Sequence, residues 1–125
     1  MTNADGLIPL RPCIKDITSM GIEIWSYNEE NGWHENWNLP EKLMMVVTEL
    51  AEAMEELRDH DSNHVYKNKD NPDKLEGFPV EVADAMIRLW DIAVNEGFGY
   101  TLVQLLNAKN EYNKTRGYRH GGRKY

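Results

Sequence analysis

The chain has 125 residues, of which 41% are apolar and 28% are charged, with a formal net charge of -7 and one cysteine. This length suits a single domain with a modest core, and we expect residues 1–125 to form a single domain. Cys13 alone cannot form an internal disulfide, the first twelve residues lack a secretion-signal pattern, and no apolar run approaches the ~20 residues of a membrane span. We therefore expect a cytoplasmic protein that binds no membrane. An acidic chain repels phosphate backbones, which also argues against general nucleic-acid binding.

Charge is distributed unevenly along the chain. Residues 1–108 carry 20 acidic and 8 basic side chains, a balance of -12, whereas residues 109–125 carry six basic side chains and one Glu, a balance of +5. Two explanations are open. Either the acids form a solvated surface with a basic tail, or they hold divalent cations while the basic end holds the anion that accompanies those cations.

Two amphipathic helices separated by an aromatic loop are predicted in the first half. The first covers about residues 13–30, and its apolar positions are Ile14, Ile17, Gly21, Ile24 and Trp25. The loop, residues 33–37, has the sequence Trp-His-Glu-Asn-Trp. The second helix covers about 38–58 and begins with Asn38 as a cap, a proline in the first turn, and Glu41 as in a capping box. Its apolar stripe is Leu43, Val46, Val47, Leu50, Met54 and Leu57.

An irregular connection and two further helices are predicted in the second half. Residues 59–78 have few apolar positions and no period, so we expect an exposed connection without strands. A third helix covers about 79–95, with an apolar stripe of Val82, Met86, Leu89 and Ala93. A fourth begins at a capping-box pattern, residues 101–104, ends before Gly117 and carries Leu102, Leu105, Leu106 and Ala108. The expected fold class is all-α, a four-to-five-helix bundle that a second copy completes.

The second and third helices share a repeated acidic motif. Residues 49–57, ELAEAMEEL, match residues 81–89, EVADAMIRL, at five of nine positions. Each copy carries two carboxylates three residues apart and hence on one helix face, well over 100° from the centre of the apolar stripe. Arg88 lies one turn further along the face of the second pair. The two pairs are Glu49 with Glu52 and Glu81 with Asp84.

Four carboxylates that converge from two helices repel one another unless cations lie between them. All-oxygen sites suit Mg²⁺ or Mn²⁺, which favour octahedral oxygen coordination and leave positions for water and substrate phosphates. The alternative is that these are ordinary acidic helix faces supported by Lys and Arg. The chain would then be a non-catalytic acidic helical interaction module or a nucleotide-binding regulator.

Two rival metal sites are weaker on sequence grounds. A carboxylate-bridged di-iron bundle needs Glu-x-x-His, and none of the four histidines has a Glu three residues before it. His60 and Asp61, with His64 four residues after His60, resemble the dyad of another phosphohydrolase class. These residues lie in the least structured segment, so we expect solvent-exposed loop histidines.

With 28 residues between its two acidic pairs, the chain resembles the MazG-like branch of the all-α nucleoside triphosphate pyrophosphohydrolases. The resemblance covers roughly residues 13–123 and includes VVTELAEAMEELR, EGFPVEVADAMIRLWDIA and KNEYNKTRGYRHGG. Members of that family hydrolyse a nucleotide between the α- and β-phosphates with Mg²⁺ or Mn²⁺. Short phage-type members look nearest and some act on (d)GTP, so we expect a purine and favour guanine. The metal ligands that the resemblance implies are Glu49, Glu52, Glu81 and Asp84.

The resemblance also implies roles for other residues. Lys109 and Asn113, one helical turn apart, match the family's phosphate-binding Lys and Asn. Glu52 or neighbouring Glu55 would orient or deprotonate the attacking water. Basic residues besides Lys109 would stabilise charge on the leaving group, although for each of them taken singly a solvated helix end is the favoured explanation. These are Arg116, Arg88, Lys114 and Arg119.

The base needs a flat or polar surface near the first helix. Candidates for stacking or edge contacts are Trp25, Asn28, Trp33 and Trp37, and core packing is an equal explanation for each Trp. Because a bundle of 125 residues needs a partner copy, we expect a homodimer or homotetramer with the active site near a subunit contact.

Overall fold

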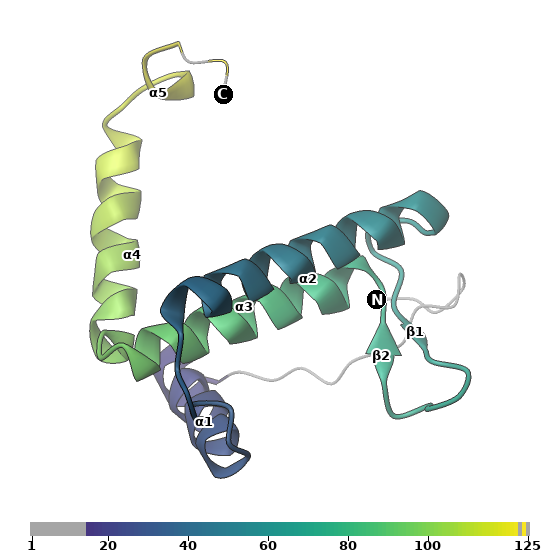
Figure 1. Cartoon of the computed structure of the whole chain (residues 1–125). Helices are drawn as coiled ribbons and strands as arrows, with labels where there is room; N and C mark the ends of the chain where they lie inside the picture. The colour runs from purple at the N-terminus through teal and green to yellow at the C-terminus, as the bar shows by residue number, and fades with distance from the viewer. Residues whose placement is uncertain (1–14, 123, 125) are drawn as a thin grey trace.

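The computed structural model describes residues 15–122 and residue 124, so Cys13 and Ile14 of the first predicted helix lie outside the described residues. The elements are α1 (Ile17–Glu30), α2 (Leu39–Asp59), β1 (Tyr66–Lys67), β2 (Leu75–Glu76), α3 (Phe78–Asn95), α4 (Gly99–Lys114) and α5 (Arg119–Gly122) (Figure 1). The chain is mostly helical, which confirms the all-α class. In the described part of the chain, no helix has the length and apolar character needed to cross a membrane.

The second and third helices start and end close to their predicted bounds, but the first and fourth start elsewhere. α1 begins at Ile17 because the Asp16 side chain caps it by accepting from the backbone N of Thr18 at 2.7 Å. The predicted start near residue 13 is therefore too early. α4 begins at Gly99, and the Oγ1 of Thr101 donates to the carbonyl of Phe98 inside the first turn. The capping box predicted at residues 101–104 is wrong, because the chain re-enters a helix immediately after α3.

The segment between α2 and α3 contains an antiparallel hairpin, so the prediction of an irregular connection is wrong there. Its turn is held by the side-chain oxygen of Asn68, which accepts from two backbone N–H groups within three residues. Tyr66 donates its hydroxyl to Glu56 of α2. His60 and His64 stack with ring centroids 4.9 Å apart, and both pack on Tyr66. They are half-buried packing residues, not exposed loop histidines. Strands of two residues show no period that sequence could reveal.

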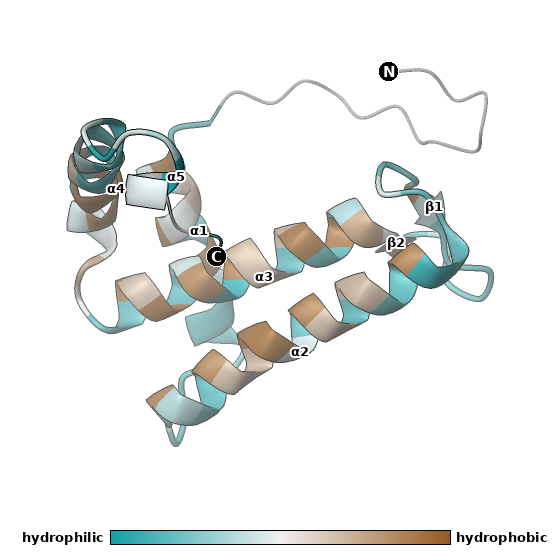
Figure 2. Cartoon of the chain, turned by 90° about the horizontal axis from the view of Figure 1, so that it is seen from above, coloured by the Kyte–Doolittle hydropathy of each residue, from teal (hydrophilic) through white to brown (hydrophobic). Residues whose placement is uncertain are grey.

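α2 and α3 lie side by side as an antiparallel pair, and α1 packs across α3 (Figures 1 and 2). α4 contacts α3 and α1, and Figure 1 shows it rising away from the α2–α3 pair. The described helices therefore do not close into one four-helix bundle within a single chain.

The core is small. Val46, Ala85 and Ile92 form its buried centre, with Trp37 and Leu39 packed against it. No large side chain among the described residues is fully buried. α1 approaches α3 closely because residue 21 is glycine: a Cβ there would lie 1.9 Å from the Trp90 ring.

The predicted apolar stripe of α2 lies largely on the surface of the single chain. Val46 is buried, but the other five positions of the stripe are exposed by between 41% and 62%. α2 turns Glu49 and Ala53 toward α3 instead. Apolar segments are correspondingly visible along both long helices in Figure 2. The exposed positions are Leu43, Val47, Leu50, Met54 and Leu57 on α2, continued by Met86 and Leu89 on α3.

Candidate metal centre and adjacent cleft

Three of the predicted acids meet between α2 and α3. One carboxylate oxygen each of Glu49, Glu52 and Glu81 lies within 4.8 Å of the others. Ala53 and Ala85 are buried at the same helix contact, where their small side chains let the backbones approach. The register of the acidic repeat thus brings both helices' carboxylates to one place. We call these three residues the acidic group.

Asp84, the fourth predicted ligand, lies beside the acidic group and not within it. It is half-buried, and burial raises its pKa. The negative charges of Glu49 and Glu52 raise the pKa further, while the charge of Arg88 lowers it. Asp84 therefore lies close enough to interact electrostatically with the acidic group, and it adds negative charge to this region.

Glu81 carries the clearest sign of excess negative charge. Its Oε2 is buried and has no hydrogen-bond donor. Burial, contacts with the carboxyls of Glu49 and Glu52, and nearby negative charge raise its pKa to about 8. A carboxyl that keeps its proton near neutral pH lacks a positive partner.

Arg88 is the single cation that pairs with the acidic group among the described residues. Its Nε donates to Oε1 of Glu49 at 2.8 Å, and the Glu49 side chain is only 9% exposed. Burial works to raise the pKa of Glu49, but the hydrogen bond and charge of Arg88 hold it below its ordinary value. One arginine thus compensates one of the three carboxylates and leaves the other two without a cation.

The acidic group fits a divalent cation. Its donor atoms are all carboxylate oxygens, as Mg²⁺ and Mn²⁺ prefer, and they are close enough to share one ion. The unpartnered oxygen and the raised pKa of Glu81 show that positive charge is lacking where such an ion would lie. The residues that would hold it are Glu49, Glu52 and Glu81, with Asp84 adjacent.

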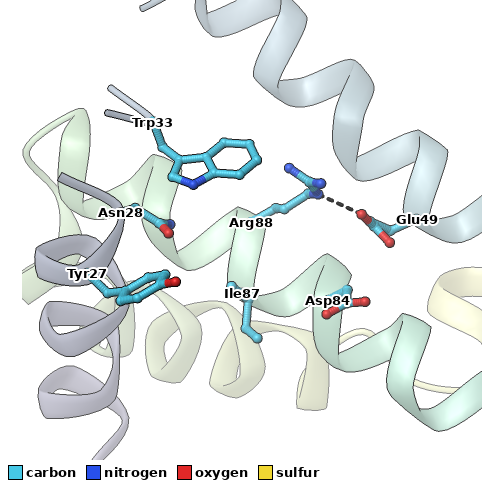
Figure 3. A pocket seen from close by; sticks show the side chains of 7 residues that line it. All are labelled: Tyr27, Asn28, Trp33, Glu49, Asp84, Ile87 and Arg88. Carbon is cyan, nitrogen blue, oxygen red and sulfur yellow. Dashed lines mark hydrogen bonds and ion pairs between the residues drawn. The ribbon is translucent and has the colours of Figure 1, made fainter. Parts of the chain in front are cut away.

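A cleft of about 300 Å³ opens directly beside these acids. Trp33, Tyr27 and Asn28 lie at one end in Figure 3, Glu49 and Asp84 lie at the other, and Arg88 lies between them. Asn28 and Trp33 were predicted from the sequence, whereas Tyr27 was missed. Its position next to Asn28, itself a predicted base-binding residue, was the available signal. The cleft offers flat and amide surfaces next to carboxylates.

The other two predicted base-binding residues have packing partners. The indole N–H of Trp25 donates to Asn95 at 3.0 Å, and its ring stacks on His34. Trp37 donates to Glu96 at 2.8 Å and borders only a neighbouring cavity of about 30 Å³. The structure therefore does not place Trp25 or Trp37 in the larger cleft.

The predicted base Glu55 and the predicted phosphate-binding residues lie elsewhere in the single chain. Glu55 is exposed and lies 3.6 Å from Arg58. Lys109 and Asn113 line a separate cavity between α4 and α1. The remaining basic residues pair locally: Lys109 and Arg116 lie over the Tyr112 ring, Lys114 pairs with Glu111, and Arg119 lies over Tyr118.

Sequence reasoning missed a second buried charged group. Asp91 is buried, and both of its carboxylate oxygens lie 2.9 Å from Nε2 of His34. Nδ1 of His34 lies 2.5 Å from Glu29. The available signal was that Asp91 continues the face of Glu81 and Arg88 at helical steps of three and four residues.

Comparisons with protein-family models, with curated proteins and with solved structures found no match to this chain. The chemistry of the site is therefore argued from its own geometry. That geometry combines an undercompensated all-oxygen acidic group, an arginine and an aromatic cleft. Such a combination suits a ligand that carries both anionic oxygens and a planar ring.

Proposed function

We propose that this protein is a cytoplasmic, Mg²⁺- or Mn²⁺-dependent pyrophosphohydrolase of the MazG-like kind. It would cleave a (deoxy)nucleoside triphosphate between the α- and β-phosphates, releasing the monophosphate and pyrophosphate, with (d)GTP as the favoured substrate. The observation that carries the proposal is the juxtaposition of the acidic group with the cleft, since Glu49 belongs to both. A phosphate beside the acids and a base against Trp33 would then fit one ligand.

The residues present support distinct roles in this reaction. A divalent cation, when bound, supplies charge neutralisation for the triphosphate and polarises the α-phosphate. Glu52 is the exposed member of the acidic group, so its carboxylate can accept a proton from the attacking water as the bond to pyrophosphate breaks. Trp33 and Asn28 offer a stacking face and an amide edge for the base. Glu55 is a poorer choice of base because it lies outside the acidic group.

We also propose that the working form is a homodimer or homotetramer. The exposed apolar stripe of α2 and the groove of about 370 Å³ that Leu43, Leu89 and Phe98 help to line are surfaces that a second copy would cover. A second copy would also supply Lys109 and Asn113, which α4 of the same chain directs away from the acids. Light scattering tests this: Leu50→Glu should yield a monomer, and a wild-type monomer with full activity would contradict the proposal.

Product identification tests the reaction. The protein is incubated with Mn²⁺ and each of dGTP, GTP, dATP, dCTP and dTTP, and products are separated by anion-exchange chromatography. We expect pyrophosphate with the matching monophosphate, fastest for a guanine nucleotide. Glu52→Gln should lose most activity, and exposed Glu30→Gln on α1 should keep it. Release of inorganic phosphate would contradict cleavage between the α- and β-phosphates.

The alternative function is a non-catalytic acidic module or a nucleotide-binding regulator. The observation in its favour is that the phosphate-binding candidates on α4 do not reach the acids within one chain. Calorimetry separates the possibilities. No heat from Mn²⁺, with or without nucleotide, would favour the module, and nucleotide binding without any cleavage would favour the regulator.

A further inference from the structure

Arg88 stands between the two halves of the candidate site. Its side chain is 29% exposed, and it lines both the main cleft and the smaller cavity that Trp37 and Asp91 border. In Figure 3 the side chain extends from α3 past Trp33 toward Glu49, where the ion pair is drawn. The guanidinium is therefore in reach of the carboxylates on one side and of the cleft on the other.

The carboxylate of Glu49 has two competing uses. It is one of the three groups whose oxygens lie within 4.8 Å of one another, and it is also the acceptor for Arg88. A divalent cation and a guanidinium that share the Glu49 carboxylate repel each other, since both are positive and that carboxylate is only 9% exposed. A cation bound to the acidic group therefore weakens the ion pair between Glu49 and Arg88.

A released guanidinium would have a second binding place nearby. The cleft next to Arg88 carries no other basic side chain among its lining residues, and Lys42 borders only the smaller cavity. An anion in the cleft would face the carboxylates of Glu49 and Asp84, with Arg88 as the one basic side chain among the lining residues. Lys42 lies over the Trp33 ring, and the charge of Lys74 acts on Asp84, but neither residue lines the cleft. Arginine binds phosphate oxygens through two parallel N–H donors, which suits it to that position.

We infer that Arg88 is an exchangeable counter-ion that couples the two halves of the site. It pairs with Glu49 until a divalent cation takes that carboxylate, and it then turns to bind a phosphate of the nucleotide in the cleft. This inference rests on the proposed function and adds an order of events to it: cation first, nucleotide second.

The side-chain Nε–H signal of Arg88 in ¹H–¹⁵N spectra reports directly on the pair, and its absence from the spectrum of Arg88→Lys assigns it. In the cation-free protein the signal should be slow to exchange with water, because the hydrogen bond to Glu49 protects it. Saturating Mg²⁺, which is diamagnetic, should shift it and speed its exchange. An Arg88 signal that Mg²⁺ leaves unchanged would overturn the inference.

Calorimetry with Mn²⁺ and with α,β-methylene-dGTP gives an independent test. Arg88→Met removes the competitor, so Mn²⁺ should bind about tenfold more tightly, the size expected for one charged hydrogen bond. The same variant, loaded with Mn²⁺, should bind α,β-methylene-dGTP about tenfold more weakly for the same reason. Arg58→Met, which removes an exposed arginine from α2, is the matched control and should change neither value. Arg88→Lys keeps the charge and should fall between wild type and Arg88→Met.

The diagnostic result is that Arg88→Met tightens Mn²⁺ binding and weakens binding of α,β-methylene-dGTP. If Arg88→Met weakens Mn²⁺ binding while wild type binds it normally, Arg88 positions Glu49 for the cation and the exchange is overturned, although the proposed function stands. If wild type binds no Mn²⁺ at all, both the exchange and the proposed function are overturned.

Discussion

Two acids on α3, Glu81 and Asp91, differ in how their negative charge is balanced. At one end of the helix, Glu81 meets the carboxylates of Glu49 and Glu52, and its buried Oε2 has no donor. Two to three turns further along, Asp91 meets the imidazole of His34 with both of its carboxylate oxygens. The carboxylates around Glu81 repel one another, whereas the carboxylate of Asp91 is paired with the imidazole of His34.

The group around His34 is a structural clasp. Its ring lies between two carboxylates, with Nε2 within hydrogen-bond distance of Asp91 and Nδ1 within hydrogen-bond distance of Glu29. The ring also stacks on Trp25 and meets Trp37 edge-on, which fixes the aromatic loop between α1 and α2. Because Trp33 belongs to that loop, the clasp holds one wall of the cleft in place.

We propose that the difference separates acids that stabilise the fold from acids that bind a ligand. Leaving a buried charge uncompensated costs free energy, so the folded chain gains from partnering Asp91 and loses from crowding Glu81. Removing Glu81 should therefore impair ligand binding without lowering stability, whereas removing Asp91 should lower stability.

The largest expected effect is on cation binding. Glu81→Gln should weaken Mn²⁺ binding and lower the turnover rate by at least about 100-fold, because loss of an outer-shell partner alone costs up to that much. Its thermal unfolding temperature should stay equal or rise, since a repelling carboxylate is removed. Calorimetry with Mn²⁺ and circular dichroism measure the two quantities. A clear loss of stability would show that Glu81 supports the fold and would remove the contrast with Asp91.

The next effect is on stability. Asp91→Leu should lower the free energy of unfolding by about 3 kcal/mol, because it leaves His34 buried with one partner fewer. Asp73→Leu, at an exposed position in the hairpin, should change it by less than about 0.5 kcal/mol. Urea unfolding followed by circular dichroism gives both values. The double variant His34→Phe/Asp91→Leu should regain much of the loss, since replacing both partners by apolar groups leaves no buried polar group of the pair without a partner. Additive losses in the double variant would argue against the clasp.

A third effect is the pH dependence of the cation-free protein. Glu81 binds its proton with a pKa of about 8 in the folded chain against an ordinary value of 4.5, so the folded state holds more protons between those values. Stability should therefore fall as the pH rises from about 4.5 to about 8, and the raised pKa of Asp84 adds in the same direction. In EDTA, the unfolding temperature should be higher at pH 5 than at pH 8. Glu81→Gln should flatten this slope, and an unchanged slope would place the responsible group elsewhere.

Much of the local structure could be predicted from the sequence. The Asn38 side chain accepts from the backbone N of Glu41 at 3.1 Å, as its capping position predicts. The acidic repeat predicts that Glu49 and Glu52 share a face, as do Glu81 and Asp84. These features depend on residues within one or two helical turns, so short-range sequence determines them.

Several features of the site could not be predicted because they join distant segments. Arg88 and Glu49 are 39 residues apart, and His34 and Asp91 are 57 residues apart. The direction of α4, which separates Lys109 from the acids, depends on how tightly the chain turns after α3. Helical periodicity carries no information on these contacts.

The sequence by itself thus determined the helical class, the cap of α2 and the register of the acids. The tertiary structure decided which face of α2 meets α3. An apolar stripe predicts burial, yet here Glu49 is buried and Leu50 is 53% exposed. The physical reason is that burial depends on the surface that a helix packs against, and the alanine-flanked acidic faces allow the closer helix contact while the apolar stripes stay exposed.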